Sequence, residues 1–211
     1  MKILTFIESI EFLEENKVPF VLGIKTINKD KDLLDSNLKD YPYVLKLSSS
    51  LVHKTEKRGV YLNLMNQKDL LSSFNFLNKL MSKEKIKGKI ILQKQVPGIE
   101  LIIGVKEDPI FGKVIMFGVG GIYTEIIKDV SFKVLPITEK DAENIISKSK
   151  IGKILFGARG IKYPTKDLIE LIIKISSLAI KKDIKELDLN PIIINENGLF
   201  IVDARVLLWS S

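Results

Sequence analysis

A single histidine stands among cationic side chains, in a short stretch between two apolar segments. His53 is the only histidine of the 211 residues, Lys54, Lys57 and Arg58 follow it, and Gly59 ends the stretch. A neutral imidazole can act as a nucleophile or as an acid–base group, and cations offset the charge of a phosphate. A lone histidine is most often structural, but these neighbours favour a role in handling a phosphoryl group.

Oxygen-bearing side chains stand on two segments that alternate like neighbouring strands. Asp188 and Asn190 are two residues apart, which puts them on one face of a strand, and Asp203 follows beyond a predicted hairpin turn. Mg²⁺ prefers one or two carboxylates together with phosphate and water oxygens. We therefore expect Asn190, Asp203 and the nearby Asp188 to form a Mg²⁺ site. The alternative is an ion pair of Asp203 with Arg205 or Lys185.

Lys46 is the last but one residue of the apolar segment Tyr43–Leu47. A lysine in a strand usually points to solvent, which is the simpler interpretation when this residue is taken alone. The functional interpretation is an ammonium group held near phosphate oxygens as a point charge.

Gly118, Gly120 and Gly121 form a cluster between two predicted strands. The spacing matches neither a dinucleotide-binding GxGxxG turn nor a Walker A sequence. A tight turn would explain these glycines, and so would a main chain that approaches a nucleotide or a partner surface. Both interpretations are open at this point.

The predicted elements indicate an α+β fold with two sheets. Apolar periodicity predicts helices at 5–16, 66–80, 138–148 and 165–178, with Thr5, Thr138 and Thr165 as N-terminal caps and Asn66 at the second helix start. Strands are predicted at 43–47, 60–64, 89–93, 100–105, 113–117, 123–128, 132–135, 189–194 and 199–206. Because strands and helices do not alternate regularly, a doubly wound sheet is disfavoured. The turn signal Pro97–Gly98 divides the chain into 1–96 and 97–211.

Composition excludes several classes of function. The chain contains no cysteine, so disulfides, thiol nucleophiles and cysteine-based zinc sites are absent. The net charge is +7, but lysines are interleaved with acidic residues, which indicates a solvated surface rather than a nucleic-acid footprint. The start of the chain carries Glu8, Glu11, Glu14 and Glu15, which a secretory signal would not, and no apolar run is long enough to cross a membrane, so we expect a cytoplasmic protein.

An ordered set of short motifs runs through the chain from about Lys17 to Leu208. They are Lys46–Ser49, His53–Glu56, Gly59–Val60, Glu100–Val105, Phe111–Gly112, Phe117–Gly121, Glu125, Asp129, Gly157–Gly160, Asp188–Pro191 and Asp203–Arg205. Together they resemble the ATP-grasp (beta) subunit of NDP-forming acyl-CoA synthetases, the ADP-forming acetate and acyl-CoA ligases. The resemblance implies an ATP-grasp fold of two α+β subdomains, 1–96 with the phosphate loop and 97–211 with the Mg²⁺ site, and a nucleotide between them.

The resemblance also implies a reaction, in which an acyl-CoA, ADP and phosphate are exchanged for a carboxylate, ATP and CoA. A phosphoryl group passes to a histidine of a partner, and a second histidine, matched by His53, relays it to the nucleotide. None of the 211 residues is left to form a CoA-binding domain. We therefore expect an alpha subunit that carries the CoA-binding and phosphohistidine domains, in an α2β2 assembly, and no activity without it.

Residue by residue, the resemblance implies that Lys46 binds the nucleotide phosphates and that Glu100 lies near the ribose. The segment Gln93, Lys94 and Val96 matches the hinge that receives the adenine through its main chain, although the family usually has an acid at Lys94. Asn190 and Asp203 match the Mg²⁺ ligands, with Asp188 nearby.

The phosphate loop departs from the family pattern at one position. Besides His53, three residues match this loop: Lys54, Arg58 and Gly59. The family usually has glycine at Arg58, which puts the movement of the loop in question. A milder departure is Lys133, where the family usually has arginine.

Two alternatives are weighed against a catalytic subunit of this family. One is a non-catalytic module that senses nucleotides, which the presence of Lys46, His53, Asn190 and Asp203 disfavours. The other is a subunit like the beta chain of succinyl-CoA synthetase, which has a longer carboxy-terminal domain and a glycine-rich stretch at the position of His53.

Overall fold

The computed structural model describes residues 1–34, 38, 40–49, 59–121, 129–157 and 160–209. The chain forms two compact units, one of Met1–Val21 with Pro97–Ser211 and the other of Leu22–Val96. The boundary between Val96 and Pro97 agrees with the one predicted from the turn signal Pro97–Gly98. The first 21 residues, however, belong with the carboxy-terminal part and not with 22–96, because β1 (Lys2–Ile3) pairs with β11 (Arg205–Leu208).

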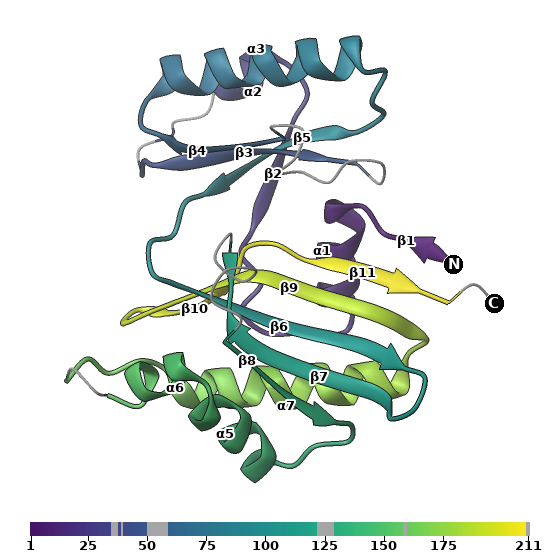
Figure 1. The fold of residues 1–211 in the computed structure, drawn as a ribbon. Coiled ribbons are helices and arrows are strands. Elements are labelled where there is room, and N and C mark those ends of the chain that lie inside the picture. Colours follow the sequence, from purple (N-terminus) through teal and green to yellow (C-terminus); the bar gives the residue numbers. More distant parts are fainter. Residues whose placement is uncertain (35–37, 39, 50–58, 122–128, 158–159, 210–211) are drawn as a thin grey trace. The chain divides into compact units, whose positions relative to one another are not determined.

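The smaller unit, Leu22–Val96, is one antiparallel sheet with helices. Its strands are β2 (Ile24–Ile27), β3 (Tyr43–Ser48), β4 (Val60–Leu64) and β5 (Lys89–Lys94), and its helices are α2 (Asp30–Leu34) and α3 (Gln67–Lys83). The strand order is β2-β5-β3-β4. Helix α3 lies along one face of this sheet (Figure 1). Its buried residues Leu70, Phe74 and Leu77 pack with Leu45 and Leu47 of β3.

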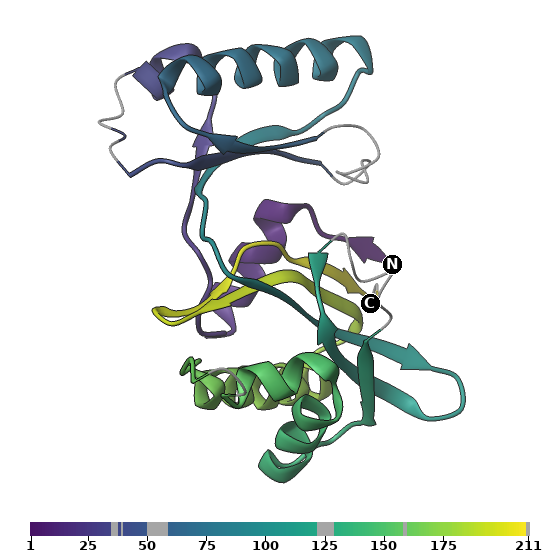
Figure 2. The same cartoon turned by 60° about the vertical axis from the view of Figure 1, so that its left-hand side comes forward.

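The larger unit is built on a seven-stranded antiparallel sheet. Its order is β1-β11-β9-β6-β7-β8, with β10 paired to β9. Besides β1 and β11, the strands are β6 (Ile99–Asp108), β7 (Gly112–Val119), β8 (Val130–Val134), β9 (Ile184–Asn195) and β10 (Gly198–Ile201). The helices are α1 (Phe6–Glu15), α5 (Glu139–Lys148), α6 (Lys150–Leu155) and α7 (Thr165–Lys181). Figures 1 and 2 show α5 and α7 on one side of this sheet and α1 on the other.

Strand alternation decides which side chains face α7. Ile103 of β6 is paired with Phe117 of β7 and with Leu189 of β9, and all three are fully buried. Helix α7 contacts these same strands. Since side chains alternate along a strand, Asp188 and Asn190 of β9 lie on the opposite face from Leu189. We call this the open face of the large sheet, because α5 and α7 do not lie on it; α1 lies on this side, against β11.

Most predicted helix caps are confirmed. Thr5 and Thr138 form capping boxes with Glu8 and Asp141, and the side chain of Asn66 accepts from the N–H of Asp69. The prediction for Thr165 was wrong by one residue. Pro164 precedes the first turn of α7 and Thr165 is already helical, without a side-chain cap.

The strand predicted at 199–206 is interrupted. It forms two strands, β10 and β11, because the stretch Val202–Ala204 leaves the ladder and the carboxylate of Asp203 accepts the N–H of Ala204 at 2.9 Å. The strand predicted at 123–128 lies outside the described residues. Over the parts of the chain that the structure describes, no helix is long and apolar enough to span a bilayer.

The chain leaves the larger unit after Val21 and re-enters it at Pro97, and both points are bound to the β9–β10 hairpin. The N–H of Ile201 donates to the carbonyl of Phe20 at 2.8 Å, and Val21 bridges to Ile201. The amide of Asn195 donates to the carbonyl of Pro97 at 2.7 Å. The two points at which the chain leaves and re-enters the larger unit are therefore fixed to one hairpin.

Candidate functional site

Lys46 and Gln93 share one face of the small sheet. Lys46 pairs with Ile91, and Val44 pairs with Gln93, so both polar side chains lie on the face away from α3. Lys46 is 5% exposed and Gln93 is 2% exposed. Burial contradicts the simpler interpretation of Lys46 as a solvent-facing strand lysine, because a lysine is seldom fully buried without a role or a partner.

The hinge segment after β5 is fixed by residues that the sequence analysis did not identify. The N–H of Gln95 donates to the carbonyl of Pro42 at 3.0 Å. Its side chain accepts from the main chain of Asn63 at 2.6 Å and donates to the Asn63 side chain at 2.8 Å. Lys94 is exposed and Val96 is half-buried, and the Lys94 ammonium lies 3.7 Å from the carboxylate of Asp40. The hinge therefore keeps a defined main-chain course although the side chain of Lys94 faces solvent.

Only the end of the predicted phosphate loop is described. Gly59 is buried, and its carbonyl accepts the N–H of Leu47 at 2.8 Å. The loop therefore returns beside the residue that follows Lys46. His53, Lys54 and Arg58 lie outside the described residues, as do Glu125 and Arg159.

The three predicted metal ligands stand on neighbouring stretches of the large sheet, Asp188 and Asn190 on β9 and Asp203 between β10 and β11. Val202 donates to the carbonyl of Pro191 at 3.4 Å, and Arg205 is in register with Asp188, so Asp203 lies opposite the stretch that contains Asn190. The pKa of Asp188 is raised to about 6, chiefly by burial and also by the charges of Asp203 and Glu186, against the opposing charge of Arg205. The structure thus brings Asp188 and Asp203 close enough for their charges to interact.

This donor set fits a hard cation. Two carboxylates and one amide oxygen are ligands that Mg²⁺ takes, and their mutual repulsion is relieved when a cation is bound. Within the described ranges there is no cluster of three or more histidine, cysteine, aspartate or glutamate residues suited to a metal. The predicted site has two carboxylates, of Asp188 and Asp203, and its third ligand is the amide oxygen of Asn190. Asparagine is not one of those four residue types.

Gly120 and Gly121, which we call the glycine turn, fold over the open face. The N–H of Gly120 donates to the carbonyl of Glu100, and the N–H of Gly121 donates to Oδ1 of Asn190, each at 2.8 Å. A Cβ at Gly120 would overlap the main chain of Leu101, and a Cβ at Gly121 would overlap the carboxylate of Glu100. Gly120 is thus required by close packing against the main chain of Leu101, whereas the Glu100 side chain could move away from a Cβ at Gly121. The two glycines link Glu100 to Asn190, which the sequence analysis had not connected.

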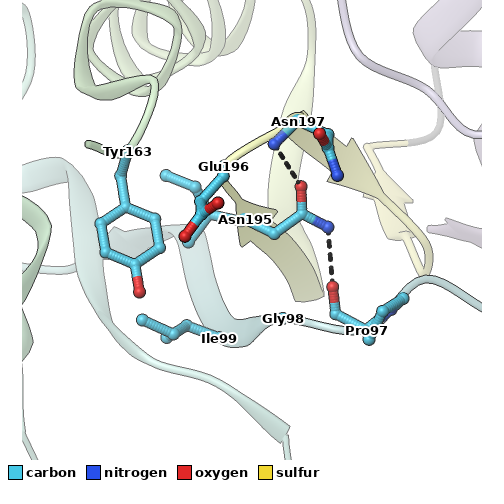
Figure 3. Close-up of a pocket in the computed structure, with 8 residues that line it drawn as sticks. Pro97, Gly98, Ile99, Tyr163, Asn195, Glu196 and Asn197 are labelled. Atoms are coloured by element: carbon cyan, nitrogen blue, oxygen red, sulfur yellow. Dashed lines mark hydrogen bonds between the residues drawn. The ribbon is translucent and has the colours of Figure 1, made fainter. Parts of the chain in front are cut away.

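A separate shallow cavity of about 260 Å³ lies beside the turn of the β9–β10 hairpin. Figure 3 shows Tyr163 on one side of it and Asn195, Glu196 and Asn197 on the other, with Pro97, Gly98 and Ile99 along the base. None of the predicted site residues lines this cavity. It is therefore distinct from the oxygen cluster on the open face.

Comparisons with known proteins identify the family of the chain. A model of the ATP-grasp domain family matches residues 1–208. The chain is 40% identical over 178 residues to acetate–CoA ligase (ADP-forming) II subunit beta of Pyrococcus furiosus, across 80% of this chain and 75% of that one. It is 41% identical over 210 residues to 4-hydroxybutyrate–CoA ligase (ADP-forming) of Nitrosopumilus maritimus, across 94% of this chain and 30% of that one.

A solved structure matches over nearly the whole chain. It is the dinucleotide-forming acetyl-coenzyme A synthetase 1 of Ca. Korarchaeum cryptofilum with coenzyme A and Mg-AMPPCP, in which a phosphohistidine segment points towards the nucleotide binding site. The TM-score is 0.80 and the identity 32%, over 99% of this chain and 93% of that one. The chain spans only 25% to 30% of the length of longer relatives such as the Nitrosopumilus ligase. By the family match and these similarities, the chain belongs to the ATP-grasp family, in the group that contains the beta subunits of ADP-forming acetate–CoA ligases.

Proposed function

We propose that this chain is the nucleotide-binding subunit of an NDP-forming acyl-CoA synthetase. The reaction is acyl-CoA + ADP + phosphate ⇌ carboxylate + ATP + CoA. The observation that carries the proposal is the oxygen cluster of Asp188, Asn190 and Asp203 on the open face, in a chain similar over most of its length to a beta subunit. Both the chemistry and the similarity point to a Mg-nucleotide.

Each nucleotide-binding role has a residue suited to it. The buried ammonium of Lys46 would neutralise phosphate oxygens. The main chain of Gln93–Val96, held in place through Gln95, would receive the adenine, and Glu100 would lie near the ribose. Asn190 and Asp203, with Asp188 beside them, would hold Mg²⁺. The cation would neutralise charge on the phosphates during transfer.

His53 is the proposed relay. One of its ring nitrogens attacks the phosphorus of a phosphohistidine on the partner, so that an N–P bond forms on His53 as the partner's N–P bond breaks. A β-phosphate oxygen of ADP then attacks the same phosphorus, which forms ATP and releases His53. Lys54, Arg58 and Gly59 would form the loop around the phosphoryl group. The phosphohistidine segment of the Korarchaeum synthetase, which points towards the nucleotide binding site of that protein, supports a transfer of this kind.

The partner would be an alpha subunit with CoA-binding and phosphohistidine domains, assembled as α2β2. One observation supports a separate partner. The two Pyrococcus relatives, which this chain covers to 75% and 81% of their length, are named as beta subunits. The acyl group is expected to be chosen by the partner.

The experiment is a reconstitution with the alpha subunit. ATP formation from acetyl-CoA, ADP and phosphate should require both chains, and His53→Ala should abolish it while ADP binding by calorimetry persists. Labelled phosphate should appear on the wild-type chain as an acid-labile, base-stable adduct and should be absent from His53→Ala. Turnover near the wild-type level in His53→Ala would rule out the relay. Binding of Mg-ADP without any phosphoryl transfer would instead identify a nucleotide-sensing module.

A further inference from the structure

The glycine turn is held from two directions on the open face. Gly120 is tied through its N–H to the main chain of Glu100, and Gly121 is tied through its N–H to the side chain of Asn190. Gly121 has a φ of +70°, a conformation that side chains disfavour, and the carboxylate of Glu100 occupies the space where its Cβ would be. The positive φ and the two hydrogen bonds together direct the N–H of Gly121 at Asn190.

This hydrogen bond determines which end of the Asn190 amide faces the glycine turn. A main-chain N–H can only donate, so the acceptor must be Oδ1, and the usual ambiguity between the amide oxygen and nitrogen is removed. A carbonyl oxygen has two lone pairs. Oδ1 can therefore accept the N–H of Gly121 and still coordinate a cation.

We propose that the glycine turn is a positioning element for Asn190, which holds its amide oxygen in the orientation that binds the metal. This inference rests on the proposed Mg²⁺ site and adds a role for two residues that do not touch the metal themselves. Groups that orient a metal ligand through hydrogen bonds affect metal affinity by about 10- to 100-fold when they are lost. Gly121 is therefore expected to set the metal affinity through its main chain.

The first test compares two glycine substitutions that share the same main-chain strain. Gly121 has φ +70° and Gly112 has φ +74°, but a Cβ at Gly112 meets nothing within 4 Å. Gly121→Ala should weaken Mg-dependent ADP binding by about tenfold more than it weakens ADP binding in EDTA, where only the displacement of the Glu100 carboxylate by the new Cβ acts. Gly112→Ala should leave both unchanged. Equal effects of the two substitutions, or no effect of Gly121→Ala, would overturn the positioning role.

A second test needs no substitution. Gly120–Gly121 is the only Gly–Gly pair among the 13 glycines of the chain. Labelling glycine with ¹³C at the carbonyl and with ¹⁵N therefore leaves one amide, that of Gly121, in a carbonyl-filtered NMR spectrum. Its resonance should shift when Mg²⁺ is added to the ADP-bound chain, because the oxygen that it contacts becomes a ligand.

The outcomes distinguish a failure of the positioning role from a failure of the proposed Mg²⁺ site. If calorimetry shows that wild-type chain binds ADP with no dependence on Mg²⁺, the proposed metal site fails. If binding depends on Mg²⁺ but the Gly121 resonance does not respond to the metal, the metal site stands and the positioning role is wrong.

Discussion

The main-chain N–H of Gly121 donates to Oδ1 of Asn190 at 2.8 Å, although 69 residues separate the two in the chain. Gly121 follows β7, and Asn190 lies within β9, with β6 between those strands in the sheet. The contact therefore crosses over β6 on the open face, and it joins the glycine turn to the oxygen cluster.

Removing the acceptor at Asn190 should affect both stability and metal binding. Asn190→Leu leaves the N–H of Gly121 without its partner, which should cost about 1 kcal/mol of unfolding free energy, and it should abolish the effect of Mg²⁺ on ADP binding. Asn190→Asp keeps an acceptor oxygen and should retain both properties. Urea unfolding can be followed by the fluorescence of Trp209, the only tryptophan of the chain. Equal stability of the two variants would contradict a contribution from this hydrogen bond.

Lys46 should contribute to nucleotide affinity. Lys46→Met replaces the buried ammonium with an apolar side chain of similar length, so we expect ADP binding to weaken by about tenfold or more, because the phosphates lose their point charge. The control is Lys89→Met on β5 of the same sheet, where the lysine is exposed. If calorimetry gives equal ADP affinities for the two variants, Lys46 does not hold the phosphates.

Asp188 should make the metal-free protein less stable as pH rises. Its pKa is raised from 3.8 to about 6, chiefly by burial, so the folded state holds this proton more tightly than the unfolded state does. Its stabilising contribution is fully present below pH 3.8 and is lost as pH rises through about 6. Two pKa units correspond to about 3 kcal/mol as an upper bound.

The measurement is the difference in unfolding free energy between the wild type and Asp188→Asn, in EDTA, between pH 4 and pH 7.5. Taking the difference removes the contribution of acids such as Asp141, whose pKa is lowered to about 2 by its contacts with Lys133 and Thr138. A difference that does not change with pH over this range would show that Asp188 titrates normally.

Asp129 should stabilise the larger unit by capping a helix from outside it. Its two carboxylate oxygens accept the N–H groups of Lys150 and Ile151, at 2.9 and 3.1 Å, in the first turn of α6. Asp129→Ala should lower the unfolding free energy by about 1 to 2 kcal/mol. Asp167→Ala, in the first turn of α7, should cost less because this residue has only the favourable charge at the helix start. Equal losses in urea unfolding would count against the cap.

Features set by neighbouring residues could be predicted from the sequence. The caps at Thr5 and Thr138 need only a partner three residues away, and the apolar faces of α3 and α7 follow from helical spacing. The return of the chain at Asp203 to the stretch of β9 that contains Asn190 could also be anticipated, because a tight turn joins the two segments. These predictions depend on rules that act over a few residues or one turn.

Features that depend on distant pairing could not be predicted in this way. No local pattern shows that Lys2 lies in register with Leu208, so Met1–Val21 was assigned to the wrong unit. The contact of Gly121 with Asn190 is likewise visible only once the sheet order is known. At the break in Val202–Ala204 the carboxylate of Asp203 accepts the N–H of the next residue, Ala204. The apolar alternation on either side gives no sign of this break.

The β9–β10 hairpin has a consequence for how the chain can be cut and joined. Val21 is held at Ile201, which pairs with Ile192, and Pro97 is held at Asn195, three residues further along β9. At about 3.3 Å per residue these points are about 10 Å apart. By connectivity, then, Leu22–Val96 is an insertion in a domain whose first and last strands already pair with each other. A linker of about five residues between Val21 and Pro97 would span that gap, so the larger unit should fold without its insert and could be given another one.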